Sequence, residues 1–339
     1  MKNILFPKNK NFYKSCLHTH STVSLDGRLS PEEIKVEYMK RGYSVVAYTD
    51  HETFVRQNHL TDENFVALNG FELSAVKEKE EGAHTFARTC HICCIALSPT
   101  ITGQPVFNVN SYTNRLSQEM IDKLNIDPKC PDFKVNYSSK SINAMIKKCL
   151  KGGFFVTYNH PAWSGETFQE YLKYQGMHAM EIFNYGCYLN GNSESDAFAY
   201  DDMLKNGKRI YCIATDDTHK ITDVGGGFTV INADELEYNA LTSALVNGDF
   251  YSSTGPEIKE ISYEDGVVKV LSSPAKIIQI KTIRRRAKGA SMAVEGKPVT
   301  SAEMIIYPED ISFRVTVIDE KGLVAWSNAY FLDQIEKNI

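Results

Sequence analysis

The chain has 339 residues, of which 42% are hydrophobic and 23% charged, and its formal net charge is −5 at pH 7. This size favours one large domain with a smaller one beside it, and this composition is that of a globular chain with a sizeable core. Because the net charge is negative, the chain has no excess of positive charge with which to bind a nucleic-acid duplex. No apolar run approaches the ~20 residues that a membrane-spanning helix needs.

The N-terminus and the cysteines predict a cytoplasmic protein. Residues 1–7 lack the continuous apolar stretch and the small-residue cleavage site of a signal peptide. The eight cysteines are scattered through apolar segments without paired spacing, which is typical of reduced thiols. The sequence does not indicate an oligomeric state.

Apolar strands alternate with helices over the first two thirds of the chain. Strands are predicted at residues 14–20, 44–48, 65–73 (interrupted by Asn69-Gly70), 91–97, 154–158, 180–183 and 209–214. Helices are predicted from the N-cap Ser30 to Arg41, from the N-cap Ser141 to the Gly152-Gly153 pair, and between residues 193 and 205. Residues 98–138 show little periodicity and predict an inserted loop.

Polar side chains follow nearly all of these strands. An open doubly wound sheet would concentrate its site at one switch point, whereas a closed barrel spreads its site over the C-terminal ends of all strands. The observed spread favours a closed barrel of parallel strands.

After residue 256 the pattern changes to short apolar or alternating runs separated by turn residues. These runs are residues 258–262, 267–271, 277–283, 304–307, 313–318 and 325–331, with a probable hairpin turn at 319–322. Residues 257–339 therefore predict a small all-β domain of the sandwich kind. Gly225-Gly226-Gly227, which precedes it, matches no phosphate-binding pattern and predicts a flexible loop.

Histidines and carboxylates at the strand exits are candidate metal ligands. They are His18, His20, Asp26, His51, Glu72, His91, His160, Asp217 and His219. His18 and His20 would share one face of an extended segment. The mixture suits zinc, manganese or iron, and its size implies two or three divalent transition metal ions. Glu72 is the natural bridge, because a carboxylate can give one oxygen to each of two ions.

Six short motifs stand in order within residues 14–220: His18-Thr19-His20, Thr49-Asp50-His51, Gly70-Phe71-Glu72, His91, Asn159-His160-Pro161 and Asp217-Thr218-His219. Together they resemble the motifs of the polymerase and histidinol phosphatase (PHP) superfamily of metal-dependent phosphoesterases. The resemblance implies an enzyme, and a distorted (βα)7 TIM-like barrel over residues 1–256.

The resemblance also implies how three metals would be held. The first would bind His18, His20, Glu72 and Asp217, the second Glu72, His91 and His160, and the third Asp26, His51 and His219. Many relatives carry His where Asp26 stands. The Asp common two residues before the first His is Cys16 here, which removes a carboxylate from the surroundings of the site.

Met180 to Asn184, Phe250 to Ile258 and the C-terminal segments 313–315 and 325–328 resemble the carbaryl-hydrolase-like branch, which carries a C-terminal β-domain. That branch includes carbamate and carboxylic ester hydrolases as well as phosphoesterases. The likeness therefore narrows the architecture more than the substrate.

We predict a multinuclear metal-dependent hydrolase of small phosphoesters, either monoesters or diesters and including nucleotides, that uses a metal-bound hydroxide. Hydrolysis of a carboxylic ester or carbamate on the same metals is an alternative, and a noncatalytic metal-binding scaffold is another. Trp163, Asn184 and Tyr185 are candidates for substrate binding, and Trp163 could wall the pocket. The other interpretation is that Trp163 covers the barrel rim and that Asn184 and Tyr185 belong to loop structure. Asp216 is a candidate for handling a proton, or for an ordinary capping role.

Overall fold

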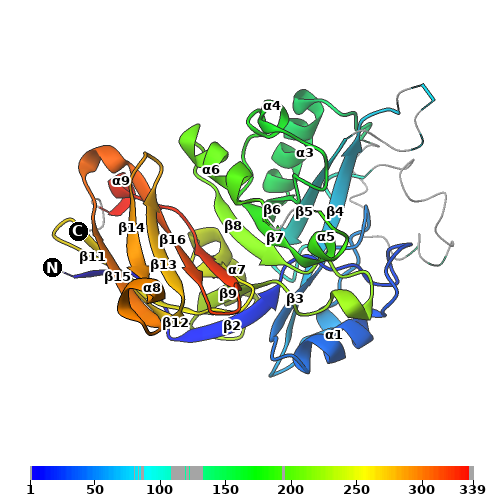
Figure 1. The fold of residues 1–339 in the computed structure, drawn as a ribbon. Helices are drawn as coiled ribbons and strands as arrows, with labels where there is room; N and C mark the ends of the chain where they lie inside the picture. The colour runs from blue at the N-terminus through cyan, green and yellow to red at the C-terminus, as the bar shows by residue number, and fades with distance from the viewer. Residues whose placement is uncertain are drawn as a thin grey trace.

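The computed structural model describes residues 2–79, 81–82, 84, 88–107, 119, 122, 133–192 and 195–335. Most of the predicted insertion at residues 98–138 lies outside these ranges. The chain forms an α/β fold with one large mixed sheet and one four-stranded sheet (Figure 1). Across the described ranges, no helix has the length and apolarity needed to cross a membrane.

Within the described residues the large sheet has 14 strands, and seven consecutive ones form the part that holds the candidate ligands; each of these seven except Ala179–Asn184 carries or leads to a ligand. These are β2 (Asn11–Cys16), β3 (Val45–Tyr48), β4 (Val66–Val76), β5 (Thr89–Ala96), β6 (Phe154–Asn159), β7 (Ala179–Asn184) and β8 (Tyr211–Thr215). β2, β3 and β4 are parallel neighbours, as are β6, β7 and β8. β5 lies antiparallel to both β4 and β6.

The strand pairing does not form the closed parallel barrel expected from the sequence. β2 pairs with β3 on one edge and with β9 (Phe228–Ala233) on the other, which leaves β8 no edge of β2 to pair with. The segments that follow β2 and β8 meet beyond these strands, at an isolated bridge between Thr19 and Thr218. β4 and β5 are antiparallel neighbours, so no crossover helix is needed between them.

The helices of this part of the chain are α1 (Pro31–Met39), α3 (Ser139–Lys151), α4 (Phe168–Tyr171), α5 (Tyr185–Leu189), α6 (Ala197–Lys205) and α7 (Tyr238–Asn247). Two 3-10 turns accompany them, η1 (Asn58–Leu60) and η3 (Ile221–Asp223). α1 begins as predicted, with a capping box between Ser30 and Glu33. The prediction that Ser141 caps α3 is wrong, because Ser138 Oγ accepts the Ser141 N–H and starts the helix earlier.

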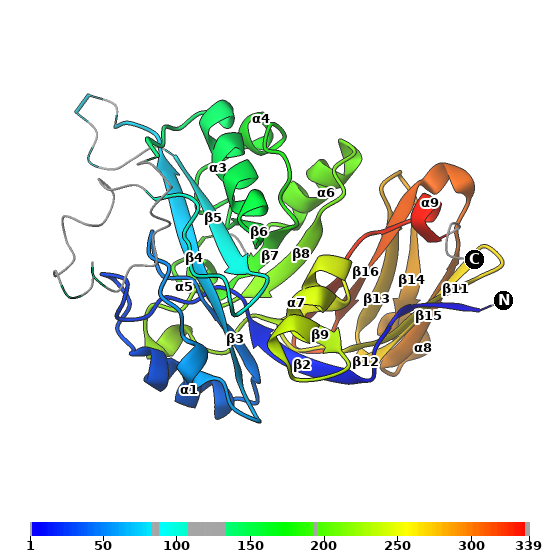
Figure 2. The ribbon, with the colours of Figure 1, turned by 180° about the vertical axis from the view of Figure 1, so that it is seen from behind.

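In the C-terminal third, two sheets face each other (Figures 1 and 2). One contains β1 (Asn3–Phe6), β11 (Ile258–Glu264), β12 (Val267–Ala275) and β15 (Val299–Ile305). The other continues the large sheet through β10 (Phe250–Ser253), β13 (Ile277–Thr282), β14 (Ala287–Ser291), β16 (Ser312–Ile318), β17 (Val324–Ser327) and β18 (Tyr330–Phe331). Short helical segments are α8 (Met292–Glu295), η4 (Pro308–Asp310) and α9 (Leu332–Ile335). Buried side chains of both sheets, such as Ile261, Val268, Ile280 and Val315, form their shared core.

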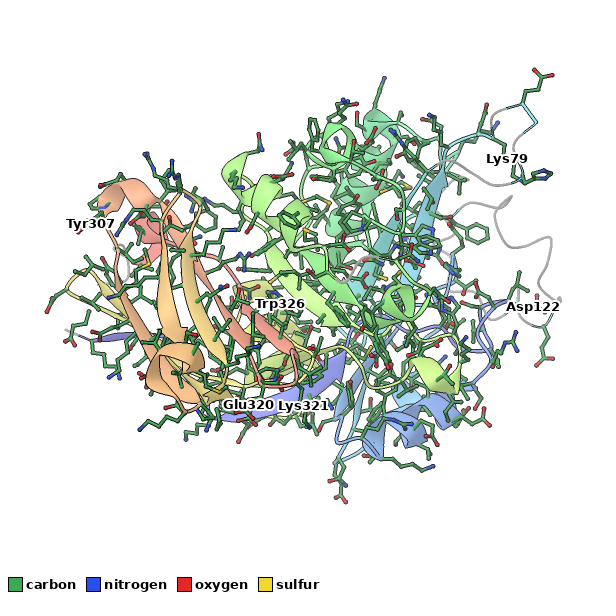
Figure 3. All side chains as sticks on the ribbon, viewed as in Figure 1. Lys79, Asp122, Tyr307, Glu320, Lys321 and Trp326 are labelled. Atoms are coloured by element: carbon green, nitrogen blue, oxygen red, sulfur yellow. The ribbon has the colours of Figure 1, made fainter. Side chains whose placement is uncertain are left out.

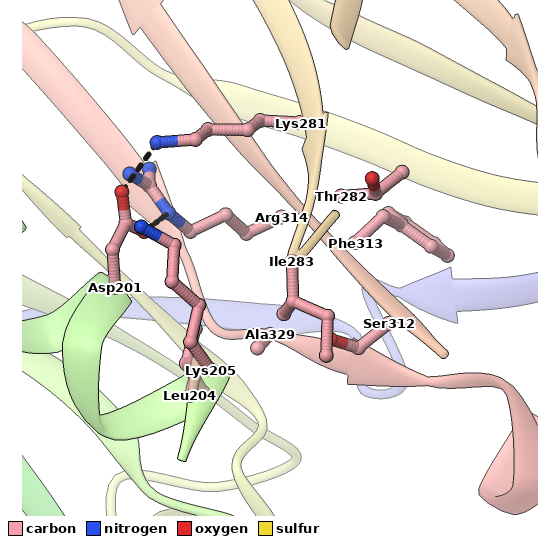
Figure 4. A pocket seen from close by; sticks show the side chains of 10 residues that line it. All are labelled: Asp201, Leu204, Lys205, Lys281, Thr282, Ile283, Ser312, Phe313, Arg314 and Ala329. Carbon is pink, nitrogen blue, oxygen red and sulfur yellow. Dashed lines mark hydrogen bonds and ion pairs between the residues drawn. The ribbon is translucent and has the colours of Figure 1, made fainter. Parts of the chain in front are cut away.

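The C-terminal strands are packed against the strands that lead to the candidate ligands. Trp326 of β17 stacks on Phe183 of β7 with ring centroids 6.2 Å apart, and Figure 3 shows Trp326 between the two parts of the molecule. Asp201 of α6 accepts a hydrogen bond from Arg314 Nε at 2.8 Å and pairs with Lys281 Nζ (Figure 4). The separation of residues 1–256 from residues 257–339 as domains stays a prediction.

Candidate metal centre

The segment after β2 places two imidazoles side by side. Thr19 Oγ1 donates to the carbonyl of Ala47 at 2.7 Å, which turns Thr19 toward β3. His18 and His20 therefore share the other face, because successive side chains of an extended segment alternate. Their ring centroids lie 5.0 Å apart, and their Nε2 atoms are 3.0 Å apart.

The structure brings all nine candidate ligands together. Their donor atoms form four overlapping groups in which the atoms lie within 4.8 Å of one another: His20, Asp26, His51 and His219; His18, His160 and Asp217; His18, His20 and Glu72; His51, Glu72 and His91. We call these nine residues the histidine cluster. Most are buried, whereas the side chains of Asp26 and His219 are 45% and 32% exposed.

Glu72 lies at the centre of the histidine cluster. Its Oε1 is 3.1 Å from His91 Nδ1 and 3.3 Å from His18 Nε2. Its Oε2 is 2.9 Å from His51 Nδ1 and 3.6 Å from His20 Nε2. His160 Nε2 also lies 3.5 Å from Oε1, so Oε1 faces three imidazoles and Oε2 two others, as the oxygens of a carboxylate shared by two cations would.

Two buried carboxylate oxygens indicate that the cluster is built for cations. Glu72 Oε2 and Asp217 Oδ1 have no hydrogen-bond partner within the described part of the chain. Imidazole nitrogens lie near both, at 2.9 Å from His51 and 3.1 Å from His20. Uncompensated buried oxygens are costly, and divalent cations would satisfy them. The donor set of imidazoles and carboxylates fits zinc, manganese or iron.

Backbone strain is concentrated at the same place. His160 has φ of 28° and Asp217 has φ of 51°, although neither is glycine. Glu52, directly after His51, has φ of 56°. Residues held in this left-handed region cost about 1–3 kcal/mol each and cluster at functional sites.

Sequence comparison identifies no relative: no protein-family model and no curated protein matches the chain. Among solved structures, a two-domain protein from Bacteroides vulgatus containing a predicted PHP-like metal-dependent phosphoesterase is 14% identical, with 97% of each chain covered and a TM-score of 0.43. The lesion-specific endonuclease PfuEndoQ from Pyrococcus furiosus is 14% identical over 70% of this chain and 56% of its own, with a TM-score of 0.41. PsfC from Pseudomonas syringae is also 14% identical, over 70% of this chain and 88% of its own, with a TM-score of 0.41. Likenesses at this level assign no activity to this chain.

The environment keeps His20 and Glu72 in the protonation states that ligands need, whereas at His18, His51, His160 and His219 burial alone would lower the pKa but the facing carboxylates raise it. Burial, together with the neighbouring imidazoles of His51 and His219, lowers the pKa of His20 to about 3, so its ring is neutral. Burial alone would raise the pKa of Glu72, but the facing imidazoles hold that pKa well below its usual range. Neutral imidazole and ionised carboxylate are the forms that bind metals.

Sequence reasoning missed the polar residues that support the cluster. Glu181 Oε1 lies 2.7 Å from His18 Nδ1, and Asn159 Nδ2 donates to Glu72 Oε1 at 3.0 Å. Asp50 accepts the Ser21 N–H at 2.6 Å and holds the turn that leads to Asp26. The sequence does carry one signal for Glu181, which is the single acidic residue of the otherwise apolar run 179–183.

The three residues predicted to touch substrate lie in different settings. The Trp163 side chain is 44% exposed, and its ring centroid is 4.9 Å from that of His160. Asn184 is buried and its Nδ2 donates to Glu181 Oε2 at 2.9 Å and Asp217 Oδ2 at 3.1 Å. Tyr185 stacks on Phe183 with a centroid distance of 6.5 Å. Of the three, only Trp163 combines an exposed ring with contact to the cluster.

Asp216 turns out to bind the triple glycine. Its carboxylate accepts the N–H groups of Gly225, Gly226 and Gly227 at 2.7, 2.9 and 2.7 Å, and the Tyr38 hydroxyl at 3.0 Å. Burial raises the pKa of Asp216 to about 6. These contacts favour the capping interpretation of Asp216, and they show the glycine segment wrapped around a carboxylate.

Proposed function

We propose that this chain is a multinuclear metal-dependent hydrolase of small phosphoesters, of the PHP kind that its motifs resemble. The observation that carries the proposal is a pair of buried oxygens without hydrogen-bond partners in the described part of the chain, Glu72 Oε2 and Asp217 Oδ1, in a cluster with six imidazoles. Burying these oxygens without partners is costly, and bound cations would offset that electrostatic cost.

The proposed ligand sets are those that the resemblance of the motifs implies. His18, His20, Glu72 and Asp217 would hold one ion; Glu72, His91 and His160 a second; Asp26, His51 and His219 a third. The third set is the most exposed, so we expect it to release its ion first on chelation. Divalent ions bound here would supply Lewis acidity, which lowers the pKa of water and neutralises charge on a phosphoryl group.

The chain's own residues would orient the reaction. Glu72, which is fully buried, would be a ligand shared by two ions. Trp163 would form one wall of the approach to His91 and His160, because its ring lies against both and stays partly exposed. The mixed sheet, whose ends meet at the Thr19–Thr218 bridge, supports an opened, distorted version of the PHP barrel.

Metal analysis and a substrate panel test this proposal. The native protein, purified without chelator, should contain at least two equivalents of transition metal. It should hydrolyse at least one member of a panel of phosphomonoesters, phosphodiesters, aryl esters and carbamates. Glu72→Ala and His160→Ala should lose metal and activity, whereas His59→Ala, an exposed histidine outside the cluster, should keep both.

Each outcome decides the proposal. Fewer than two metal equivalents, or turnover unchanged in Glu72→Ala and His160→Ala, would overturn it. Turnover of aryl esters or carbamates without any phosphoester would replace the phosphoesterase with the ester or carbamate hydrolase. Full metal content without turnover of any panel member would favour the noncatalytic scaffold.

A further inference from the structure

Glu181 is a fully buried carboxylate whose hydrogen-bonding capacity is used completely. Its Oε1 lies 2.7 Å from His18 Nδ1 and accepts from Thr215 Oγ1 at 2.6 Å. Its Oε2 accepts from the His160 N–H at 3.0 Å and from Asn184 Nδ2 at 2.9 Å. Four donors around two oxygens stabilise an ionised carboxylate in a buried position.

The contact with His18 selects the tautomer of that ring. An ionised carboxylate only accepts hydrogen bonds, so it places the proton of His18 on Nδ1. In the neutral ring that a metal requires, the Nε2 lone pair then points at Glu72 and Asp217, both 3.3 Å away. Asn159 Nδ2 also approaches His18 Nδ1, but at 3.3 Å, and the shorter contact with Glu181 dominates.

The same carboxylate reaches two further candidate ligands. Through Oε2 it holds the backbone N–H of His160, the residue with φ of 28°. Through Asn184, whose Nδ2 is shared with Asp217 Oδ2 at 3.1 Å, it contacts a ligand from the end of β8. Glu181 thus links side chains delivered by β2, β6 and β8.

We propose that Glu181 is a positioning residue that sets the metal affinity of the cluster, by fixing the His18 tautomer and the spacing of His18, His160 and Asp217. This inference rests on the proposed function, because it assumes that the cluster holds metals. Partners that orient a ligating histidine in this way typically change metal affinity by about 10–100-fold when they are replaced.

The substitution Glu181→Gln tests the inference without changing side-chain size. A glutamine has one accepting oxygen, so its amide nitrogen must face either His18 and Thr215 or the donors of His160 and Asn184. We expect metal affinity, measured by competition with a chromophoric chelator, to fall at least 10-fold. The absorption spectrum of the cobalt-loaded protein should change as well.

Glu166→Gln is the matched control. Glu166 is also buried, but it accepts hydrogen bonds from the hydroxyls of Tyr137 at 2.7 Å and Tyr158 at 2.6 Å, and from that of Tyr174. Hydroxyls can turn to accept from an amide. This variant should therefore keep the metal affinity and the cobalt spectrum of the native protein.

A measurement on the native protein keeps the inference testable if Glu181→Gln does not fold. Nitrogen-15 NMR of labelled histidines should show the His18 proton on Nδ1. A proton on Nε2 would overturn the inference, as would native affinity and spectrum in folded Glu181→Gln. Native protein that binds no metal would overturn the proposed function itself, whatever the tautomer of His18.

Discussion

At the scale of single residues, burial and backbone strain coincide at the candidate ligands. His160 and Asp217 adopt positive φ, and Asp217 and Glu72 each keep one buried oxygen without a hydrogen bond. The rest of the fold must offset these costs in the metal-free chain. Bound cations would remove the electrostatic part, so metal binding and stability should be coupled.

Chelation should therefore destabilise the native protein, because it would remove the cations bound by Glu72. A ligand that binds only the folded state adds about 2.7 kcal/mol at 100 times its Kd. We expect the free energy of unfolding, measured with urea, to fall by about that amount when a strong chelator is added. The fall should shrink in Glu72→Ala, which removes a ligand of two of the three ions, and persist in full in His59→Ala. An equal fall in both variants would contradict the coupling.

At the scale of elements, close approach of backbones explains the glycines better than flexibility does. The predicted interruption of the third strand at Asn69-Gly70 is wrong, because β4 runs unbroken from Val66 to Val76. A side chain at Gly70 would meet the carbonyl oxygen of Cys94 at 2.9 Å. Because Gly70 has no side chain, strand β5 can pack closely against β4, and β4 is not interrupted.

The triple glycine shows the same principle in a loop. Its N–H groups surround Asp216, and the middle glycine packs against an aromatic ring: a Cβ on Gly226 would lie 2.2 Å from the ring of Tyr185. The expected flexible loop is therefore a closely packed segment. It adjoins the end of β8, where Asp217 takes its strained conformation.

Gly226→Ala should destabilise the protein by about 1–3 kcal/mol, the usual cost of forcing a methyl group into a packed site. Urea unfolding in the presence of chelator would measure this cost apart from metal effects. The double variant Gly226→Ala/Tyr185→Ala should lose less than the sum of its single variants, because the smaller side chain removes the clash. Strict additivity would show that the ring is not the obstacle.

At the scale of the whole molecule, an ion cluster with a buried Asp201–Arg314 pair and a partly exposed Lys281 joins the C-terminal strands to the helical layer. Asp201 of α6 and Arg314 of β16 are 8% and 7% exposed, and Lys281 of β13 completes the group (Figure 4). Removing one partner of such a pair leaves a buried charge without compensation. The cluster therefore contributes to the packing of the two parts against each other.

Asp201→Asn should lower the free energy of unfolding at pH 7 by about 3 kcal/mol. Burial alone would raise the pKa of Asp201, but Arg314 and Lys281 lower it below its usual value. The stabilisation is thus fully present above the unfolded-state pKa of about 4 and is lost as pH falls below it. The difference between native and variant proteins should shrink below about pH 4.

The exposed pair of Arg209 and Asp333 provides the control for that experiment. Both side chains are nearly half exposed, at 47% and 49%, with a separation of 2.7 Å. Exposed pairs contribute about 0–1 kcal/mol, so Asp333→Asn should change stability little. An equal loss in the two variants, or a loss in Asp201→Asn that does not depend on pH, would contradict the assigned role.

The sequence by itself determined the approximate positions of β2 to β8, the first helix cap and the nine residues that the structure brings together, whereas β1 and β14 were not predicted. These follow from local signals: apolar period, capping residues, and polar side chains directly after apolar runs. The direction of β5 and the missing barrel closure were decided only in three dimensions, because β2 has two edges and both are taken. The partner of His18 was likewise hidden, since Glu181 is 163 residues away and no local pattern joins the two.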